Sequence, residues 1–231
     1  LHGQLRHFSA ILSRIPASTG TPSTVACIVR DITDRKQAEL ALHESKQAIR
    51  ALLEATSASG LTLDQRIHSV LALGCHRFRL PIGLMTKAEG DQLVITHAWD
   101  PDRRFAPGMH LPLCQSYCGK TLTEAQPVAI DHAGQSEWRT HPGYQTLGLE
   151  SYLGTKLVGE HQVFGTICFL GPAARLAPFT SAEKDFLLLM ARWVSGELDR
   201  HKSEQALRIS EERFEIAFRS SPHPVVITEL A

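Results

Sequence analysis

The sequence is poor in aromatic residues and has no excess of charge of either sign. Trp, Tyr and Phe make up 6% of its 231 residues, and 24 Lys and Arg are balanced by 24 Asp and Glu. Binding to nucleic acid or to an anionic membrane usually depends on a basic surface, so this balance gives no support to either kind of partner. Apolar runs such as FLLLMA at 186–191 are far shorter than the about 20 residues that span a bilayer. We therefore expect neither nucleic-acid binding nor membrane contact.

Paired cysteine motifs are also absent. The five cysteines are Cys27, Cys75, Cys114, Cys118 and Cys168. Their number is odd, they are scattered through apolar contexts, and no C-x-x-C pair occurs, which argues against a disulfide framework and a zinc ribbon. We expect reduced, buried thiols, a cytoplasmic location and no metal site.

Both ends of the chain have strand patterns that lack partners. Residues 4–15 and 24–32 alternate as β-strands around the turn-forming segment 16–23, which predicts a hairpin. A lone hairpin is marginally stable in water, so we expect its partner strands to lie outside this chain. The last segment, SSPHPVVITEL, predicts another strand without partners.

A helical pattern follows the hairpin. Asp34 and Gln37 have capping-box spacing at its start. The positions that then recur every three or four residues are Ala38, Leu42, Ser45, Ile49, Leu52 and Thr56. Such a short and partly polar heptad seam predicts a helix that pairs in a dimer while flanking domains help to hold it.

The middle of the chain predicts an α+β module with one antiparallel sheet. Thr62 and Gln65 have capping-box spacing before a helix that runs to Phe78, and Thr180 and Glu183 repeat that spacing before the helix AEKDFLLLMARWVSGEL. Between them the pattern predicts strands at 82–86, 93–99, 109–113 and 127–131, a helix at 115–125, an irregular or helical segment, and two strands around the turn GEH. The expected order is αβββαβαββα.

The flanking segments resemble parts of PAS domains. CIVRDITDRKQAELAL is similar to the end of a PAS domain, and the matching residues are Asp31, Ile32, Thr33, Arg35, Lys36, Ala38 and Glu39. The tail ALRISEERFEIAFRSSPHPVVITEL resembles the opening of a second PAS domain through Ser210, Glu211, Arg213 and Phe214.

Residues 59–198 resemble a GAF domain through CGKTLTEAQPVAID, LGLESYLGTKLV, VFGTICFL and PFTSAEKDFLLLMARWVS. The resemblance implies a layout with a PAS hairpin at 1–33, a helical linker at 34–58, the GAF domain at 59–198, a second linker at 199–213 and the start of another PAS domain at 214–231. It implies a sensory and signal-relay region of a bacterial sensor histidine kinase, or of a diguanylate cyclase. In such an array the GAF domain senses a small ligand, and we expect a homodimer through residues 36–56 and 186–213.

Two groups of residues are candidates for a binding site. Cys114 and Cys118 have i, i+4 spacing near His110, and on one helix they would share a face that could bind a metal, sense redox state or hold a cofactor. The alternative is that they are small core residues. The second group consists of Asp131, Trp138, His141, Tyr144 and Tyr152, which fall on the pocket loops of the resemblance. They could hold a small ligand, or simply pack the loops.

Other activities of related domains lack their residues here. Bilin-binding GAF domains attach chromophore through a Cys before a His, but Thr140 precedes His141, so covalent attachment is not expected; Cys75-His76 lies on a different predicted helix. The GAF-like enzymes that reduce free methionine sulfoxide share Cys118-Gly119, but their catalytic Cys would lie near residues 143–144, where no Cys occurs. The cyclic-nucleotide signature N-K-x-x-F is absent.

His43-Glu44 resembles the phosphoacceptor pair of sensor kinases, but its continuation SKQAIR differs from theirs, which favours a solvated helix position. We expect no catalytic residue in this chain, and the ligand stays unidentified.

Overall fold

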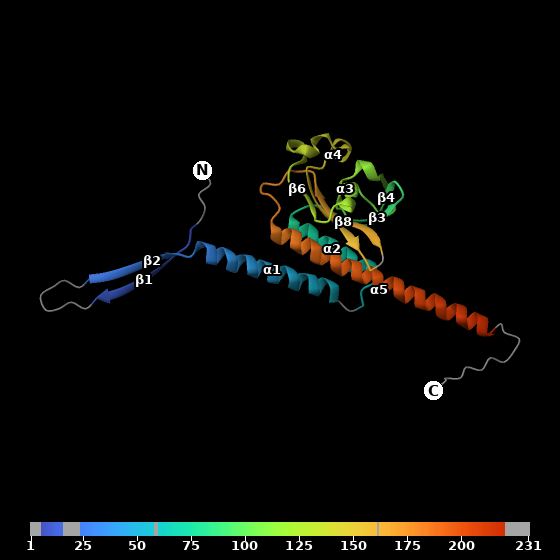
Figure 1. Cartoon of the computed structure of the whole chain (residues 1–231), viewed down its shortest axis with the longest axis horizontal. Helices are drawn as coiled ribbons and strands as arrows, with labels where there is room; N and C mark the ends of the chain where they lie inside the picture. The colour runs from blue at the N-terminus through green and yellow to red at the C-terminus, as the bar shows by residue number, and fades with distance from the viewer. Residues whose placement is uncertain (1–5, 16–23, 58–59, 161, 220–231) are drawn as a thin grey trace, which may run out of the picture. The chain divides into compact units, whose positions relative to one another are not determined.

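The computed structural model describes residues 6–15, 24–57, 60–160 and 162–219, drawn in colour in Figure 1. They divide into two compact units, Leu1–Ala51 and Leu52–Ala231. Each is described by itself below.

The first unit begins with the expected hairpin. Strand β1 (Phe8–Ile15) pairs antiparallel with β2 (Thr24–Asp31), and the register joins Phe8 to Asp31. Five large apolar side chains among its described residues are more than half exposed; they are Phe8, Ile11, Leu12, Ile28 and Val29. The hairpin is thus held by its backbone ladder more than by a core.

Helix α1 (Thr33–Ser57) begins one residue before the predicted cap. Asp34 therefore lies inside the first turn, and the carboxylate of Asp31 accepts a hydrogen bond from the Thr33 amide at 2.9 Å instead. The side chains of the predicted heptad seam differ in burial along the helix: Leu42 is 57% exposed, whereas Leu52 is 4% exposed.

The second unit is a six-stranded antiparallel sheet with helices on both faces, in the strand order β5-β4-β3-β8-β7-β6. Its strands are β3 (Ile82–Glu89), β4 (Gln92–Trp99), β5 (His110–Pro112), β6 (Val128–Ile130), β7 (Ser151–Val158) and β8 (Val163–Gly171). Its helices are α2 (Leu63–Phe78), α3 (Tyr117–Thr123), α4 (Pro142–Leu147) and α5 (Ser181–Arg219), with short 3-10 helices η1 (Leu113–Gln115), η2 (Ala133–Gln135) and η3 (Glu137–Thr140). The predicted α+β order is confirmed.

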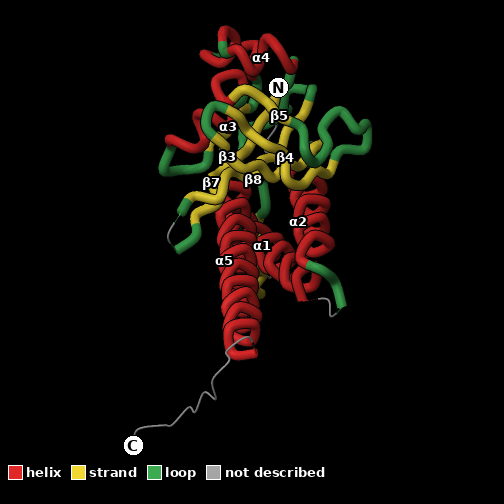
Figure 2. The backbone as a smooth tube through the Cα atoms, turned by 90° about the vertical axis from the view of Figure 1, so that its right-hand side faces the viewer, coloured by secondary structure: helices red, strands yellow, loops and turns green. Residues whose placement is uncertain are grey.

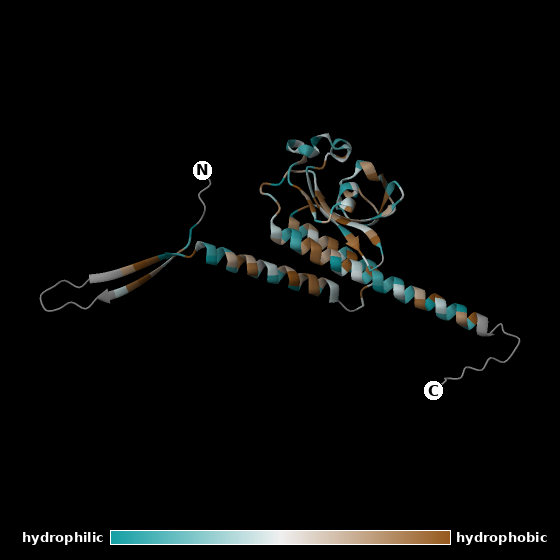
Figure 3. Ribbon diagram, viewed as in Figure 1, coloured by the Kyte–Doolittle hydropathy of each residue, from teal (hydrophilic) through white to brown (hydrophobic). Residues whose placement is uncertain are grey.

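Two long helices cover one face of the sheet. Figures 1 and 2 show α2 and α5 side by side under the strands, with α3 and α4 on the other side. Phe169 of β8 packs against Phe78 of α2 with ring centroids 4.9 Å apart, and Phe78 also meets Phe186 of α5 at 6.0 Å. The strands of the sheet are largely in the brown of apolar residues in Figure 3, and the helices beneath them alternate brown with teal. Strand β8 is buried on both faces from Gly165 to Gly171.

Both capping boxes of this unit are confirmed. The Thr62 hydroxyl accepts from the Gln65 amide while the Gln65 side chain accepts from the Thr62 amide. At the start of α5 the same exchange joins Thr180 and Glu183. Each box satisfies amides that a helix start leaves without partners.

Helix α5 is continuous where two elements were expected. It passes through residues 198 and 213 without a break and ends at Arg219. The strand expected at 220–230 lies outside the described residues. None of the described helices has the length and apolar character needed to cross a membrane.

Candidate functional site

Four rings gather on the sheet face opposite α2 and α5. Tyr117 of α3 lies at the centre, with ring centroids 5.6 Å from Trp138, 5.4 Å from His141 and 5.2 Å from Tyr152. Trp138 and His141 also meet at 5.2 Å. Tyr117 and Tyr152 are buried, whereas Trp138 and His141 are partly exposed, so the cluster runs from the core to the surface.

The backbone of α4 fixes the orientation of His141. This residue is the N-cap of α4, and its Nδ1 accepts a hydrogen bond from the Gly143 amide at 3.0 Å. Burial lowers the pKa of His141 below its ordinary value. Nδ1 must be unprotonated to accept this bond, so the geometry and the pKa shift both favour a neutral ring.

A carboxylate that the sequence analysis overlooked lies beside this cluster. Glu150 accepts from the Gly134 amide at 2.9 Å and from the Tyr144 hydroxyl at 2.8 Å, and His132 lies 3.6 Å away. The pKa of Glu150 is held below its ordinary value, chiefly by the hydrogen bond from the Gly134 amide. The hydrogen bond from Tyr144 and the charge of His132 act in the same direction. Only the tertiary fold joins Glu150 to η2, and no local pattern in the sequence marks it.

A buried polar network lies beneath α3. Cys118 Sγ is 3.6 Å from Cys168 Sγ of β8 and 3.6 Å from the Tyr152 hydroxyl, which is 2.5 Å from Thr121 Oγ1. The hydrogen bond from Cys168 lowers the pKa of Cys118, and the same bond together with burial raises the pKa of Cys168. The two directions indicate that Cys168 donates within this pair and Cys118 accepts.

The structure brings together some of the predicted site residues. Trp138, His141 and Tyr152 meet around Tyr117, and Tyr144 joins them through Glu150. Sequence analysis missed Tyr117 as a site residue, although it directly precedes the Cys118-Gly119 match.

Two predicted residues lie elsewhere. Asp131 accepts a hydrogen bond from the Phe179 amide at 2.8 Å, so it anchors the loop before α5. Cys114 is exposed on η1, and extended Ser116 separates it from α3, so Cys114 and Cys118 do not share a helical face. His110 lies on β5 and not on α3.

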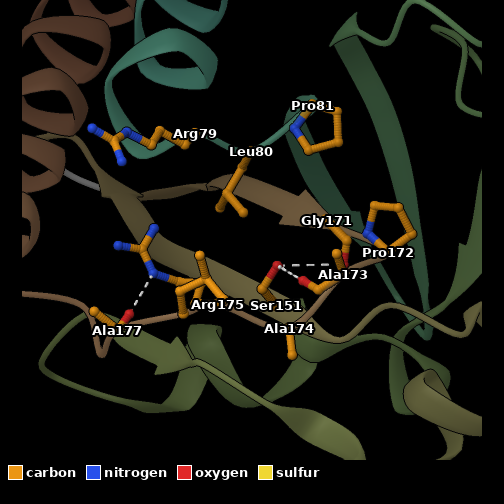
Figure 4. Close-up of a pocket in the computed structure, with 11 residues that line it drawn as sticks. Arg79, Leu80, Pro81, Ser151, Gly171, Pro172, Ala173, Ala174, Arg175 and Ala177 are labelled. Atoms are coloured by element: carbon orange, nitrogen blue, oxygen red, sulfur yellow. Dashed lines mark hydrogen bonds between the residues drawn. The ribbon is translucent and has the colours of Figure 1, made fainter. Parts of the chain in front are cut away.

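A cavity of about 390 Å³ lies where β3 and β7 begin and β8 ends, beside the loop 171–177. Figure 4 shows two of its polar side chains bonded to that loop: Ser151 donates to the Ala173 carbonyl at 2.9 Å, and Arg175 Nε donates to Ala177 at 3.1 Å. Arg175 also pairs with Glu183 at 2.9 Å. These groups hold the loop in place and are not left open for a ligand.

The other candidate chemistries find no support in the part of the chain that the structure describes. No group of three or more His, Cys, Asp or Glu residues there could hold a metal ion. Thr140 is exposed on η3. Cys75 is buried in α2, and burial raises its pKa to about 12, which leaves the thiol unreactive. His43 is exposed on α1, where it contacts Gln47.

A family model described as "GAF domain" matches residues 39–198. Solved structures share the fold at low identity. The GAF domain of an Acinetobacter phosphoenolpyruvate-protein phosphotransferase is 12% identical with a TM-score of 0.55, covering 72% of this chain and 98% of that chain. Free methionine-R-sulfoxide reductase from Neisseria meningitidis is 12% identical with a TM-score of 0.56, covering 70% and 93%. The A. aeolicus nlh2 GAF domain is 10% identical with a TM-score of 0.51, covering 70% and 99%. No curated protein sequence matches.

Proposed function

The chain belongs to the GAF domain family, and we propose that it is a sensory and relay region of a signal-transduction protein, in which the domain binds a small ligand beside Tyr117, Trp138 and His141. The observation that carries this proposal is the unequal cover of the sheet. Long helices pack on one face, and the other carries short helices and loops with an aromatic cluster that reaches the surface. Aromatic walls with a few fixed polar groups are typical of small-molecule sites.

The chemistry of the cluster indicates the kind of ligand. Trp138 and His141 are partly exposed and offer ring faces, with buried Tyr117 packed behind them, while the carboxylate of Glu150 is already bonded to Gly134 and Tyr144. A flat, partly apolar molecule would stack against the rings. The Tyr144–Glu150 pair would define the polar edge of its site.

The parent protein is proposed from the resemblance of the flanks. The PAS-like segments at 1–33 and 214–231 favour a PAS–GAF–PAS array in the cytoplasm that controls a sensor histidine kinase, with a diguanylate cyclase as the alternative output. Ligand binding would shift the helices that enter and leave the GAF domain, and dimeric helices would carry that shift onward.

Native mass spectrometry of the full chain, together with thermal shifts across a panel of planar metabolites, tests the ligand site. We expect a noncovalent adduct or a raised melting temperature that Trp138→Ala and His141→Ala abolish. His201→Ala, at an exposed position of α5, should leave the response unchanged. Absence of any response, or a response that both cluster variants retain, would contradict the proposal.

A further inference from the structure

The two buried thiols of the second unit lie in contact although 50 residues separate them in sequence. Cys118 comes from α3 and Cys168 from the central strand β8, and their sulfurs are 3.6 Å apart. Cys118 is 5% exposed and Cys168 is fully buried. A disulfide needs the sulfurs about 2.05 Å apart, so the two sulfurs must approach by about 1.5 Å for the bond to form.

Hydroxyl groups surround this pair, where a purely apolar core would place methyl groups. The Tyr152 hydroxyl lies 3.6 Å from Cys118 Sγ and 2.5 Å from Thr121 Oγ1, and Thr121 in turn donates to the Tyr117 carbonyl at 3.2 Å. Ser116 and Thr166 are buried on the other sides, and their hydrogen bonds further favour the thiolate form of Cys118. A thiolate is the form of cysteine that attacks an electrophile.

We propose that Cys118 and Cys168 are an oxidisable pair that a small peroxide converts into a disulfide joining α3 to β8. The Cys118 thiolate attacks one peroxide oxygen, and the O–O bond breaks to release an alcohol, or water from hydrogen peroxide. Cys168, which loses its proton, then attacks the sulfur of the resulting Cys118 sulfenic acid; the S–O bond breaks and its oxygen leaves as water. Two thiols and one peroxide thus yield one disulfide, and the peroxide is the electron acceptor.

Cys118 lies next to the aromatic cluster, so the oxidation of its thiol would act on residues of that cluster. Its neighbour Tyr117 is the centre of the aromatic cluster, and Tyr152 contacts both Tyr117 and Cys118. Because both sulfurs are buried, the step requires the seven-residue helix α3 to open locally so that a peroxide reaches the pair. The proposal does not depend on the ligand-binding function.

The exposed thiols must be removed before the pair can be tested cleanly. A Cys27→Ser, Cys114→Ser chain replaces the two exposed cysteines and keeps Cys75, Cys118 and Cys168. This chain is treated with hydrogen peroxide in the folded state, denatured, alkylated with N-ethylmaleimide and weighed intact. We expect the alkylated thiols to fall from three to one, and a phosphine reductant to restore all three. Peptide mapping should find residues 118 and 168 linked.

Further variants separate this pair from chance oxidation. Adding Cys75→Ala should leave the disulfide intact, whereas adding Cys168→Ala should abolish it and leave a sulfenic acid at residue 118 that dimedone traps. The unmutated chain, mapped in the same way, shows whether the substitutions changed the outcome. The proposal would be overturned if three thiols were still alkylated after peroxide treatment, or if the disulfide joined Cys75 to another cysteine. It would also be overturned if the folded chain gave the same mixture of disulfide pairs as the chain oxidised in urea.

Discussion

At the scale of the residue, the hydrogen-bond partner decides what a polar side chain does. Asp131 and Glu150 are both partly buried carboxylates, yet one accepts from the amide of Phe179 and the other from the amide of Gly134. The first therefore holds the loop before α5, and the second borders the aromatic cluster. Their sequence surroundings give no hint of this division.

His141→Asn should weaken the dependence of stability on pH. The folded pKa of His141 is lowered by burial, so the unfolded chain binds a proton that the folded chain refuses. Stability is lost as pH falls through the unfolded value of about 6.5, and the loss is complete below the folded pKa. Asn can still cap α4. Urea unfolding between pH 8 and pH 5 should show a smaller decline for the variant, with His201→Asn as the control; equal declines would contradict this assignment.

Glu183→Ala should cost about 3–5 kcal/mol, because it leaves Arg175 without its partly buried ion partner and leaves the Thr180 amide without its acceptor in the capping box of α5. Glu183→Gln can still accept from the Thr180 amide, so it should cost less. The measurement is the urea midpoint, with exposed Glu204→Gln as the control. Equal midpoints for Glu183→Ala and the wild type would show that the network contributes nothing.

At the scale of the element, a single glycine sets how closely α2 approaches the sheet. A Cβ on Gly74 would overlap the ring of Phe169 and approach Met190 Cε to 2.8 Å. Phe169 also packs on Phe78, so it has little room to move aside. Gly196 of α5 has no neighbouring atom within 4 Å of such a Cβ.

The two glycines therefore predict opposite results for the same substitution. Gly74→Ala should destabilise the domain by about 1–3 kcal/mol through overpacking. Gly196→Ala should stabilise it by up to about 1 kcal/mol, since alanine is the better helix former. Thermal and urea unfolding measure both, and a neutral Gly74→Ala would show that α2 can shift at no cost.

At the scale of the whole molecule, the exposed end of α5 is the feature that the GAF core does not explain. Leu207 and Phe214 are 61% and 60% exposed, and Ile209 and Ile216 are 46% and 68% exposed. Each pair is spaced by one heptad, but two residues turn a helix by about 200°, so the pairs lie on nearly opposite sides. A two-helix seam can bury only one of them.

The proposed homodimer is tested by charging each stripe separately. We expect the wild type to be a dimer by light scattering after size exclusion. One double variant carries Leu207→Glu and Phe214→Glu, and the other carries Ile209→Glu and Ile216→Glu. The variant that charges the stripe facing the partner helix should be a monomer, and the other should stay a dimer. His201→Glu lies between the stripes and should leave the mass unchanged. A wild type that stays monomeric at high concentration would exclude the dimer.

The sequence by itself determined the order of the elements, the α+β class, both capping boxes of the GAF unit and the hairpin before α1. These depend on contacts within a few residues, such as those between Thr180 and Glu183, which composition and spacing reveal. It also placed Trp138, His141 and Tyr152 on one cluster, through the resemblance to a GAF domain.

The tertiary structure alone decided which distant side chains meet. Cys118 contacts Cys168 and not Cys114, because α3 packs over β8 and an extended residue separates η1 from α3. Glu150 meets Gly134 because β6 and β7 are neighbours in the sheet. Strand order and register fix such contacts, and both result from packing the whole chain, so no local pattern records them.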